Sequence, residues 1–293
     1  MFKSLADAIR EAEARNTTLS AVALAAESED GGRTVADIRA TLGRALTVMR
    51  SAVKQGLVGD LYSASGLVGG DAAKLRTGPA GPLAGTPFRD ILARALAVQE
   101  VNAAMGVIVA APTAGGAGVL PAVLTGLADA RGLSDEQLVD GLACAALIGA
   151  VIAERASLSG AEGGCQAETG SGAAMAAGAA TEMLGGSPSQ CGHAVALAMQ
   201  GTLGLVCDPL GGLVELPCVF RNATGAAIAM AGIEMALAGI TFAIPVDEVI
   251  DVMGEIGASM DVRYRETAGG GLAATPTGRR LAKERLYQIK KAT

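Results

Sequence analysis

The sequence predicts a mainly α-helical fold, and three observations support this. Aromatic residues make up only 2% of the 293 residues, while 41 residues are glycine and 51% are apolar. Small side chains let helices pack closely, whereas β-sandwiches depend on branched and aromatic residues. Apolar residues recur at helical spacing, and no clear period-two alternation indicates a strand. We therefore expect a large all-helical domain with Gly/Pro-rich loops available for an active site.

The segment 34–55 is the first long helix that the sequence predicts. Thr34 is a suitable N-cap and Gly56 a suitable stop. Its apolar residues recur every three or four positions, which places them on one face: Ile38, Leu42, Leu46, Met49 and Val53. This face should pack against the core.

Two later segments carry equally clear helix signals. Ser134 and Gln137 fit a capping box, and the apolar stripe that follows is Leu138, Leu142, Ala145, Ile148 and Ile152. Pro245 precedes two acidic residues in a first turn, which is the end of a helix that negative charge stabilises. That second helix continues through Val249, Ile250, Met253 and Ile256 to Gly257.

Clusters of glycine and proline interrupt the rest of the chain and predict loops, among them 112–118, 160–172 and 208–217. Residues 1–65 are more charged than the middle of the chain and could form a peripheral helical lobe beside a core at 66–280. No long linker separates the two parts.

The charge pattern and the hydropathy exclude two classes of partner. The net charge is −6, and the basic residues are scattered, so nucleic-acid binding is not expected. Residues 101–128 carry no charge and exceed the length of a membrane span, but Pro112, Pro121 and a run of glycines interrupt them. We expect this stretch in a soluble core without membrane contact, and the absence of a signal-like start predicts a cytoplasmic protein.

Three of the five cysteines stand beside turn-forming residues: Cys165, Cys207 and Cys218. Thiolates on rigid, irregular backbone suit an iron–sulfur cluster, because nearby amides can donate to the sulfurs. Two alternatives remain open. Buried cysteines are common in packed cores, and a Cys₃His zinc site could use His193, although the close-paired cysteine spacing of such sites is missing. Cys144 and Cys191 fall in expected helices.

The segment from Pro112 to Gly118 is the second candidate site. Its flexible backbone can turn successive N–H groups toward an anion such as a carboxylate. It lacks the Gly-Lys-Ser/Thr ending of a phosphate-binding loop and the pattern of a dinucleotide site. A plain turn between two helices is the alternative.

Together these segments resemble the α chain of the iron–sulfur-dependent L-serine dehydratases, a family that the chain is similar to over nearly its whole length. The blocks that carry the resemblance are Gly69–Ala72, Glu100–Gly106, Ala110–Gly115, Gly160–Gln166, Cys207–Cys218 and Arg221–Ala223. The resemblance implies a single catalytic domain over 1–293.

The resemblance implies that Cys165, Cys207 and Cys218 bind a [4Fe–4S] cluster whose fourth iron stays open. That iron would act as a Lewis acid on the serine hydroxyl during elimination of water, giving pyruvate and ammonia in amino-acid catabolism that feeds gluconeogenesis. The cluster takes the place of pyridoxal phosphate, so we expect no PLP.

The resemblance also implies the residues around the substrate and a partner chain. The expected substrate-binding residues are Asp71, Asn102, Pro112, Thr113, Ala114, Gly115 and Asn222. A separate β subunit should complete the site in a hetero-oligomer, and His193 and Lys74 are the local candidates for the proton acceptor. Relatives often carry Ser-Cys where this chain has Gly116-Ala117, so a related lyase acting on cysteine or another β-substituted amino acid is the alternative.

Overall fold

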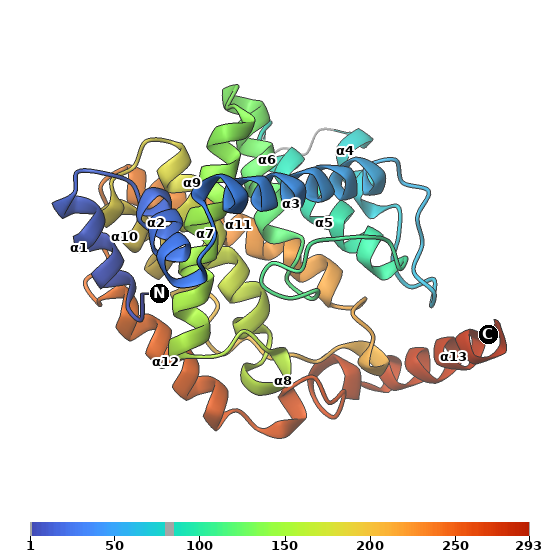
Figure 1. Ribbon diagram of the computed structural model, residues 1–293. Coiled ribbons are helices and arrows are strands. Elements are labelled where there is room, and N and C mark those ends of the chain that lie inside the picture. The colour runs from blue at the N-terminus through green and yellow to red at the C-terminus, as the bar shows by residue number, and fades with distance from the viewer. Residues whose placement is uncertain (1, 80–84, 293) are drawn as a thin grey trace.

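The chain folds into helices joined by irregular segments, which confirms the predicted mainly α fold (Figure 1). The computed structural model describes residues 2–79 and 85–292, with side chains described up to residue 285. Within these residues there is no strand, only isolated bridges between Tyr62 and Gly69 and between Cys207 and Arg265.

The helices follow one another along the whole chain. They are α1 (Leu5–Ala14), α2 (Leu19–Gly31), α3 (Val35–Gly56), α4 (Asp71–Thr77), α5 (Phe88–Ala103), α6 (Val119–Arg131), α7 (Asp135–Arg155), α8 (Gly160–Gly163), the π-helix η1 (Gln166–Gly170), α9 (Ser171–Met183), α10 (Pro188–Gln200), α11 (Cys218–Leu237), α12 (Val246–Ser259) and α13 (Pro276–Ala292). Short 3₁₀ turns occur at η2 (Leu210–Gly212), η3 (Val262–Tyr264) and η4 (Gly271–Ala274).

Helix α9 lies at the centre of the fold and packs against α6, α7, α10 and α11. Its residues from Ser171 to Thr181 are all buried. Small residues make this packing possible: a Cβ on Gly178 would lie 2.4 Å from Ile148 Cδ1 and 2.8 Å from Val195 Cγ2. The high glycine and alanine content therefore serves close helix contacts in a dense core.

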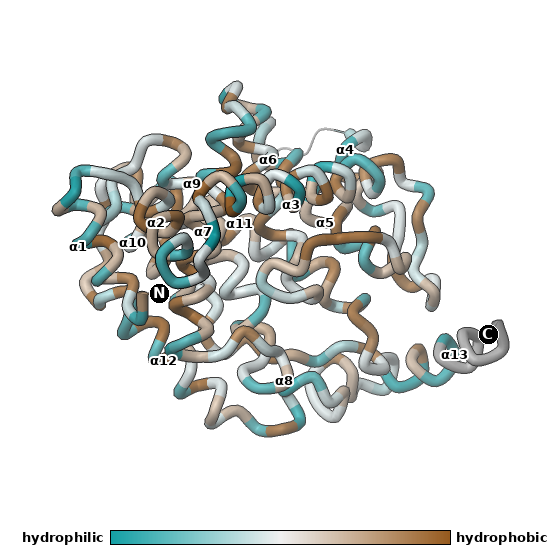
Figure 2. The backbone as a smooth tube through the Cα atoms, viewed as in Figure 1, coloured by the Kyte–Doolittle hydropathy of each residue, from teal (hydrophilic) through white to brown (hydrophobic). Residues whose placement is uncertain are grey.

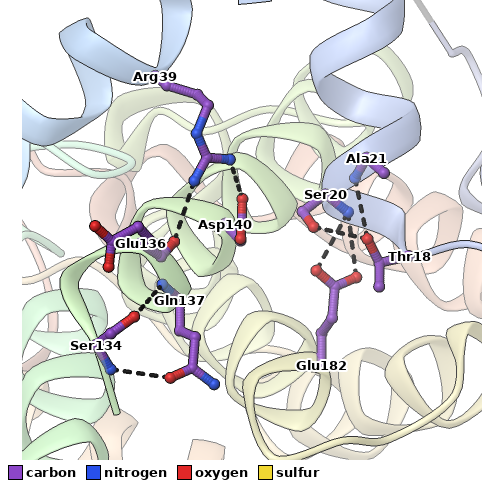
Figure 3. Close-up of polar contacts among 9 residues, drawn as sticks. All are labelled: Thr18, Ser20, Ala21, Arg39, Ser134, Glu136, Gln137, Asp140 and Glu182. Carbon is purple, nitrogen blue, oxygen red and sulfur yellow. Dashed lines mark hydrogen bonds and ion pairs between the residues drawn. The ribbon is translucent and has the colours of Figure 1, made fainter. Parts of the chain in front are cut away.

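The three helices that the sequence predicted are confirmed, and α3 and α7 begin at their predicted N-caps. The predicted stops are wrong by one or more residues, because Gly56 is the last residue of α3 and α12 continues past Gly257 to Ser259. Thr34 accepts from the amide of Asp37 at the start of α3, and Figure 2 shows hydrophobic and hydrophilic residues alternating along this helix. Ser134 and Gln137 form both bonds of the capping box of α7 (Figure 3). Pro245 precedes α12.

The uncharged stretch 101–128 is not one continuous helix. It comprises the end of α5, an irregular segment and α6. Among the described helices, only α7 is long and apolar enough to cross a membrane, and 67% of its apolar window is buried inside the fold. A core helix of a soluble protein passes the same test.

Helices α1 to α3 share the main core with the rest of the chain. Leu5 and Leu19 are completely buried and belong to the same apolar cluster as the central helices. Asp247 on α12 accepts from the Leu5 amide at 2.8 Å, and Arg39 on α3 pairs with Asp140 on α7 (Figure 3). The first 65 residues are thus joined to the core by apolar and polar contacts.

Candidate functional site

Cys165 lies at the point where α8 gives way to the π-helix η1. Gly164 precedes it with a φ of 77°, a conformation that favours glycine, and a Cβ there would lie 2.7 Å from the Met260 side chain. The sulfur of Cys165 is 3.2 Å from Thr169 Oγ1. π-Helices are rare and are frequently found at functional sites.

The segment 160–172, which the sequence predicted to be a loop, is mostly helical. It contains α8, η1 and the start of α9, so that prediction is wrong in its extent. Buried packing overrides the low helix propensity of glycine here: a Cβ on Gly170 would lie 2.5 Å from Thr202 Oγ1.

Cys207 and Cys218 bracket an irregular segment between α10 and α11. The amide of Cys207 donates to Tyr264 O at 2.7 Å, and the Glu266 amide donates to Cys207 O at 2.8 Å. Cys218 is the first residue of α11. In the segment between them, Glu215 accepts from Ser63 Oγ at 2.7 Å, which fastens the segment to the chain before α4.

The three thiols are buried close enough to influence one another's charge. Burial is the largest cause that raises the pKa of each thiol, and the charge of Cys165 raises the pKa values of Cys207 and Cys218 further, the latter to about 12. Arg221 lies beside them. Burial disfavours its charge, but Cys165, Asp208 and Cys218 outweigh burial and raise its pKa above the usual value.

The donor set fits an iron–sulfur cluster. Three buried thiols become thiolates only if positive charge replaces the lost water, and a metal centre supplies that charge. In the described part of the chain, no three His, Cys, Asp or Glu side chains converge tightly enough for a single metal ion. A cluster contains several irons, so its cysteine ligands need not converge on one point.

The segment 112–118 is held in place through its carbonyl groups. Gln99 Nε2 donates to Ala114 O at 2.9 Å, and Asn222 Nδ2 donates to Gly115 O at 2.7 Å. The amides of Thr113, Ala114 and Gly115 find no acceptor in the described residues. Unpaired amides held on a fixed turn are suited to a carboxylate. The sequence left this interpretation open beside a plain turn between two helices, and it stays a prediction.

Asn222 connects this segment to the cysteines. It lies one turn after Cys218 on α11 and donates to Cys218 O at 2.9 Å, while its Oδ1 accepts from the Gly118 amide at 2.9 Å. Because Asn222 is completely buried, its bonds fix the segment 112–118 against the start of α11, the helix that begins with Cys218.

Glu168 is a further site residue, which the sequence reasoning missed. Its Oε1 accepts from Thr113 Oγ1 at 2.7 Å, and its Oε2 lies 3.8 Å from the sulfur of Cys207. Burial raises the pKa of this carboxyl group. The sequence did contain a signal for this residue, because Glu168 is the one charged residue in the otherwise uncharged stretch 163–181.

Comparison with known proteins identifies the family. A family model described as serine dehydratase alpha chain matches residues 14–273. The chain belongs to the serine dehydratase alpha chain family. It is similar to the probable L-serine dehydratase, alpha chain, of Bacillus subtilis, at 48% identity over 97% of this chain and 95% of that protein.

The match covers different shares of two further relatives. The L-serine dehydratase alpha chain of Peptoniphilus asaccharolyticus is 47% identical over 68% of this chain and 70% of its own length. The L-serine dehydratase of Streptomyces coelicolor is 43% identical over 89% of this chain, but the match covers only 58% of that protein. That relative therefore carries extra sequence within one chain.

The remaining predicted substrate-binding residues, Asn102, Pro112 and Asp71, lie on α5, in the segment 112–118 and on α4. Asn102 Nδ2 is 3.4 Å from Ala114 O in this segment, and Pro112 lies near Gly172 at the start of α9. Asp71 and Lys74 form an ion pair of 2.8 Å on α4. Asp71 thus binds a neighbouring lysine on a short surface helix.

Neither candidate proton acceptor gains support from its surroundings. The hydrogen bond to Asp71 and its charge raise the pKa of the exposed Lys74, which keeps this lysine protonated. His193 accepts from the Phe242 amide at 3.3 Å through Nδ1, on the side of α10 that faces the segment before α12. A Cys₃His zinc site with His193 gains no support from these contacts.

Cys144 and Cys191 are core residues on α7 and α10, as their helical positions predicted. Both are completely buried. Burial is the first cause of their raised pKa values, and the carboxylate of Glu182 adds to it. They contact neither the segment 112–118 nor the other three cysteines through any hydrogen bond among the described residues.

Proposed function

We propose that this chain is the catalytic α subunit of an iron–sulfur L-serine dehydratase that converts L-serine to pyruvate and ammonia. The observation that carries the proposal is the junction of three buried cysteines with a segment of unpaired amides, joined through Asn222. Membership of the serine dehydratase alpha chain family supports the substrate and the reaction.

Cys165, Cys207 and Cys218 would hold a [4Fe–4S] cluster with three protein ligands. When bound, the cluster supplies Lewis-acid chemistry that assists a poor leaving group such as hydroxide. Arg221, itself paired with Asp208 at 2.7 Å, offsets negative charge at this position. No residue is proposed to bind PLP.

The chain's own residues bind and orient the substrate. The amides of Thr113, Ala114 and Gly115 receive the substrate carboxylate, while Gln99 and Asn222 keep the carbonyls of the same segment turned away from it. Amides fixed in this way bind an anion without reorganising, which favours catalysis.

A separate β subunit is proposed to supply the proton acceptor and to complete a hetero-oligomeric enzyme. The ion pair of Lys74 with Asp71 and the position of His193 on α10 support a source outside this chain. The extra sequence in the Streptomyces coelicolor relative is consistent with a fused second region. We propose a cytoplasmic enzyme that contacts neither membrane nor nucleic acid.

A related lyase acting on cysteine or another β-substituted amino acid is the second candidate. It rests on Gly116 and Ala117 in the segment 112–118, the proposed anion-binding segment. A Cβ on Gly116 would lie 2.8 Å from Glu168 O, and Ala117 is completely buried. Comparing pyruvate released from L-serine with pyruvate and sulfide released from L-cysteine separates the two candidates.

The test of the proposed function replaces cysteines one at a time in protein purified anaerobically with its β subunit. We expect Cys207→Ser to lose most of its iron and sulfide and its pyruvate formation from L-serine, because a cluster held by three thiolates depends on each. Cys191→Ala is the matched control: it removes an equally buried thiol and should keep both. Full iron content and turnover in Cys207→Ser would contradict the proposal.

A further inference from the structure

The carboxylate of Glu168 occupies a space that two glycines leave open. A Cβ on Gly115 would lie 2.8 Å from Oε1, and one on Gly160 would lie 2.5 Å from Oε2. Gly115 belongs to the anion-binding segment, and Gly160 begins α8 just before Cys165. The carboxylate of Glu168 therefore lies between the proposed anion-binding segment and Cys207.

The two oxygens of Glu168 differ in their partners. Oε1 accepts a short bond from Thr113 Oγ1, whereas the one donor near Oε2 in the described chain is the thiol of Cys207 at 3.8 Å. If Cys207 is a metal-bound thiolate, it has no proton to donate. Oε2 would then be a buried carboxyl oxygen without a donor, which is costly unless a cation or another donor binds.

We propose, on the basis of the function proposed above, that the Glu168 carboxylate binds the α-ammonium group of the amino-acid substrate. An α-amino acid carries its ammonium and its carboxylate on the same carbon, so the groups that bind them must be neighbours. Thr113 places the two binding groups side by side, because its hydroxyl donates to Glu168 while its amide belongs to the anion-binding segment.

This assignment divides recognition of the substrate between two elements. The segment 113–115 receives the carboxylate, and η1 supplies the opposite charge for the ammonium. An ammonium–carboxylate contact in a buried site is charge-assisted and is stronger than a neutral hydrogen bond. Glu168 would thereby select amino acids over hydroxy acids and simple carboxylic acids.

The experiment measures equilibrium binding of two unreactive ligands that differ only in the ammonium group, L-alanine and propanoate. Calorimetry is done anaerobically on the iron-loaded α–β enzyme. We expect the unaltered enzyme to bind L-alanine about 10- to 100-fold more tightly than propanoate. Glu168→Gln should abolish this preference and leave propanoate affinity within about twofold. Equal affinities in the unaltered enzyme would overturn the proposal.

Glu162→Gln is the matched control, because it neutralises an exposed carboxylate on α8 and should keep the preference. If Glu168→Gln loses iron, Glu168→Asp serves instead, and its shorter side chain should reduce the preference. A preference that stays unchanged in either Glu168 variant would show that the ammonium binds elsewhere. If the unaltered enzyme forms pyruvate in that case, the proposed function stands and only this inference fails.

Discussion

At the scale of single residues, Asn222 is a buried site residue whose side chain is bonded to the backbone of two other segments. The family resemblance placed it among the substrate-binding residues, a prediction that stays untested. Its Oδ1 accepts from Gly118, and its Nδ2 donates to Gly115 and Cys218. Because both polar atoms of its side chain are hydrogen-bonded to the backbone, Asn222 is suited to positioning the proposed anion-binding segment.

Replacing Asn222 by alanine should lower the free energy of unfolding by about 2 to 4 kcal/mol, because buried backbone groups lose their partners. It should also weaken propanoate binding, since the segment is no longer fixed. Thr224→Ala, on an exposed position of the same helix, should change stability by no more than about 0.5 kcal/mol. Urea unfolding and calorimetry check both, and an Asn222 variant as stable as the Thr224 variant would contradict this role.

At the scale of elements, α8 and η1 lie close to Cys207, and a glycine at the start of α8 makes this close packing possible. Gly160 starts α8, and a Cβ on it would lie 2.5 Å from Glu168 Oε2 and 3.2 Å from Cys207 Sγ. The absence of a side chain therefore lets two elements distant in sequence meet at one point. Gly43 in α3 has nothing within 4 Å of its Cβ position.

Gly160→Ala should reduce the iron content of the anaerobically purified enzyme, because the added methyl group displaces Glu168 or Cys207. Gly43→Ala makes the same chemical change in the middle of a helix with open space around it. It should keep the iron and raise the free energy of unfolding by about 0.5 to 1 kcal/mol. Iron analysis and urea unfolding measure both variants, and equal iron content would show that this contact is unimportant.

At the scale of the whole molecule, a half-buried glutamate, Glu182, joins two helices that are far apart in sequence. Glu182 on α9 accepts from the Ser20 amide of α2 at 3.2 Å, as Figure 3 shows. Burial is the first cause of its raised pKa. The carboxyl group of Glu182 therefore stays protonated to a higher pH in the folded protein than in the unfolded chain, where the pKa of a glutamate is about 4.3.

This difference predicts how stability depends on pH. Between the unfolded and the folded pKa of Glu182, the folded state binds more protons, so the free energy of unfolding falls as pH rises. Glu182→Gln keeps an oxygen acceptor for Ser20 but cannot ionise. The stability of this variant relative to the unaltered chain should therefore increase as the pH rises from about 4 toward neutral. Urea unfolding across this range tests it, and a constant difference would contradict it.

The sequence by itself determined the local features of this protein. The helices that begin after Thr34, Ser134 and Pro245 were predicted, the first two with their N-caps, because helical periodicity and capping depend on residues only a few positions apart. The family was also readable, since its motifs are contiguous blocks. The assignment of three cysteines as cluster ligands came from that resemblance and stays a prediction.

Only the tertiary structure decided which residues meet. Glu168 reaches Thr113 and Cys207, and the glycine-rich segment 160–172 became helical. Lys74, a candidate base from sequence, proved to be an exposed partner of Asp71. These outcomes depend on burial and on contacts between residues far apart along the chain, whose energies outweigh local propensity and leave no periodic pattern in the sequence.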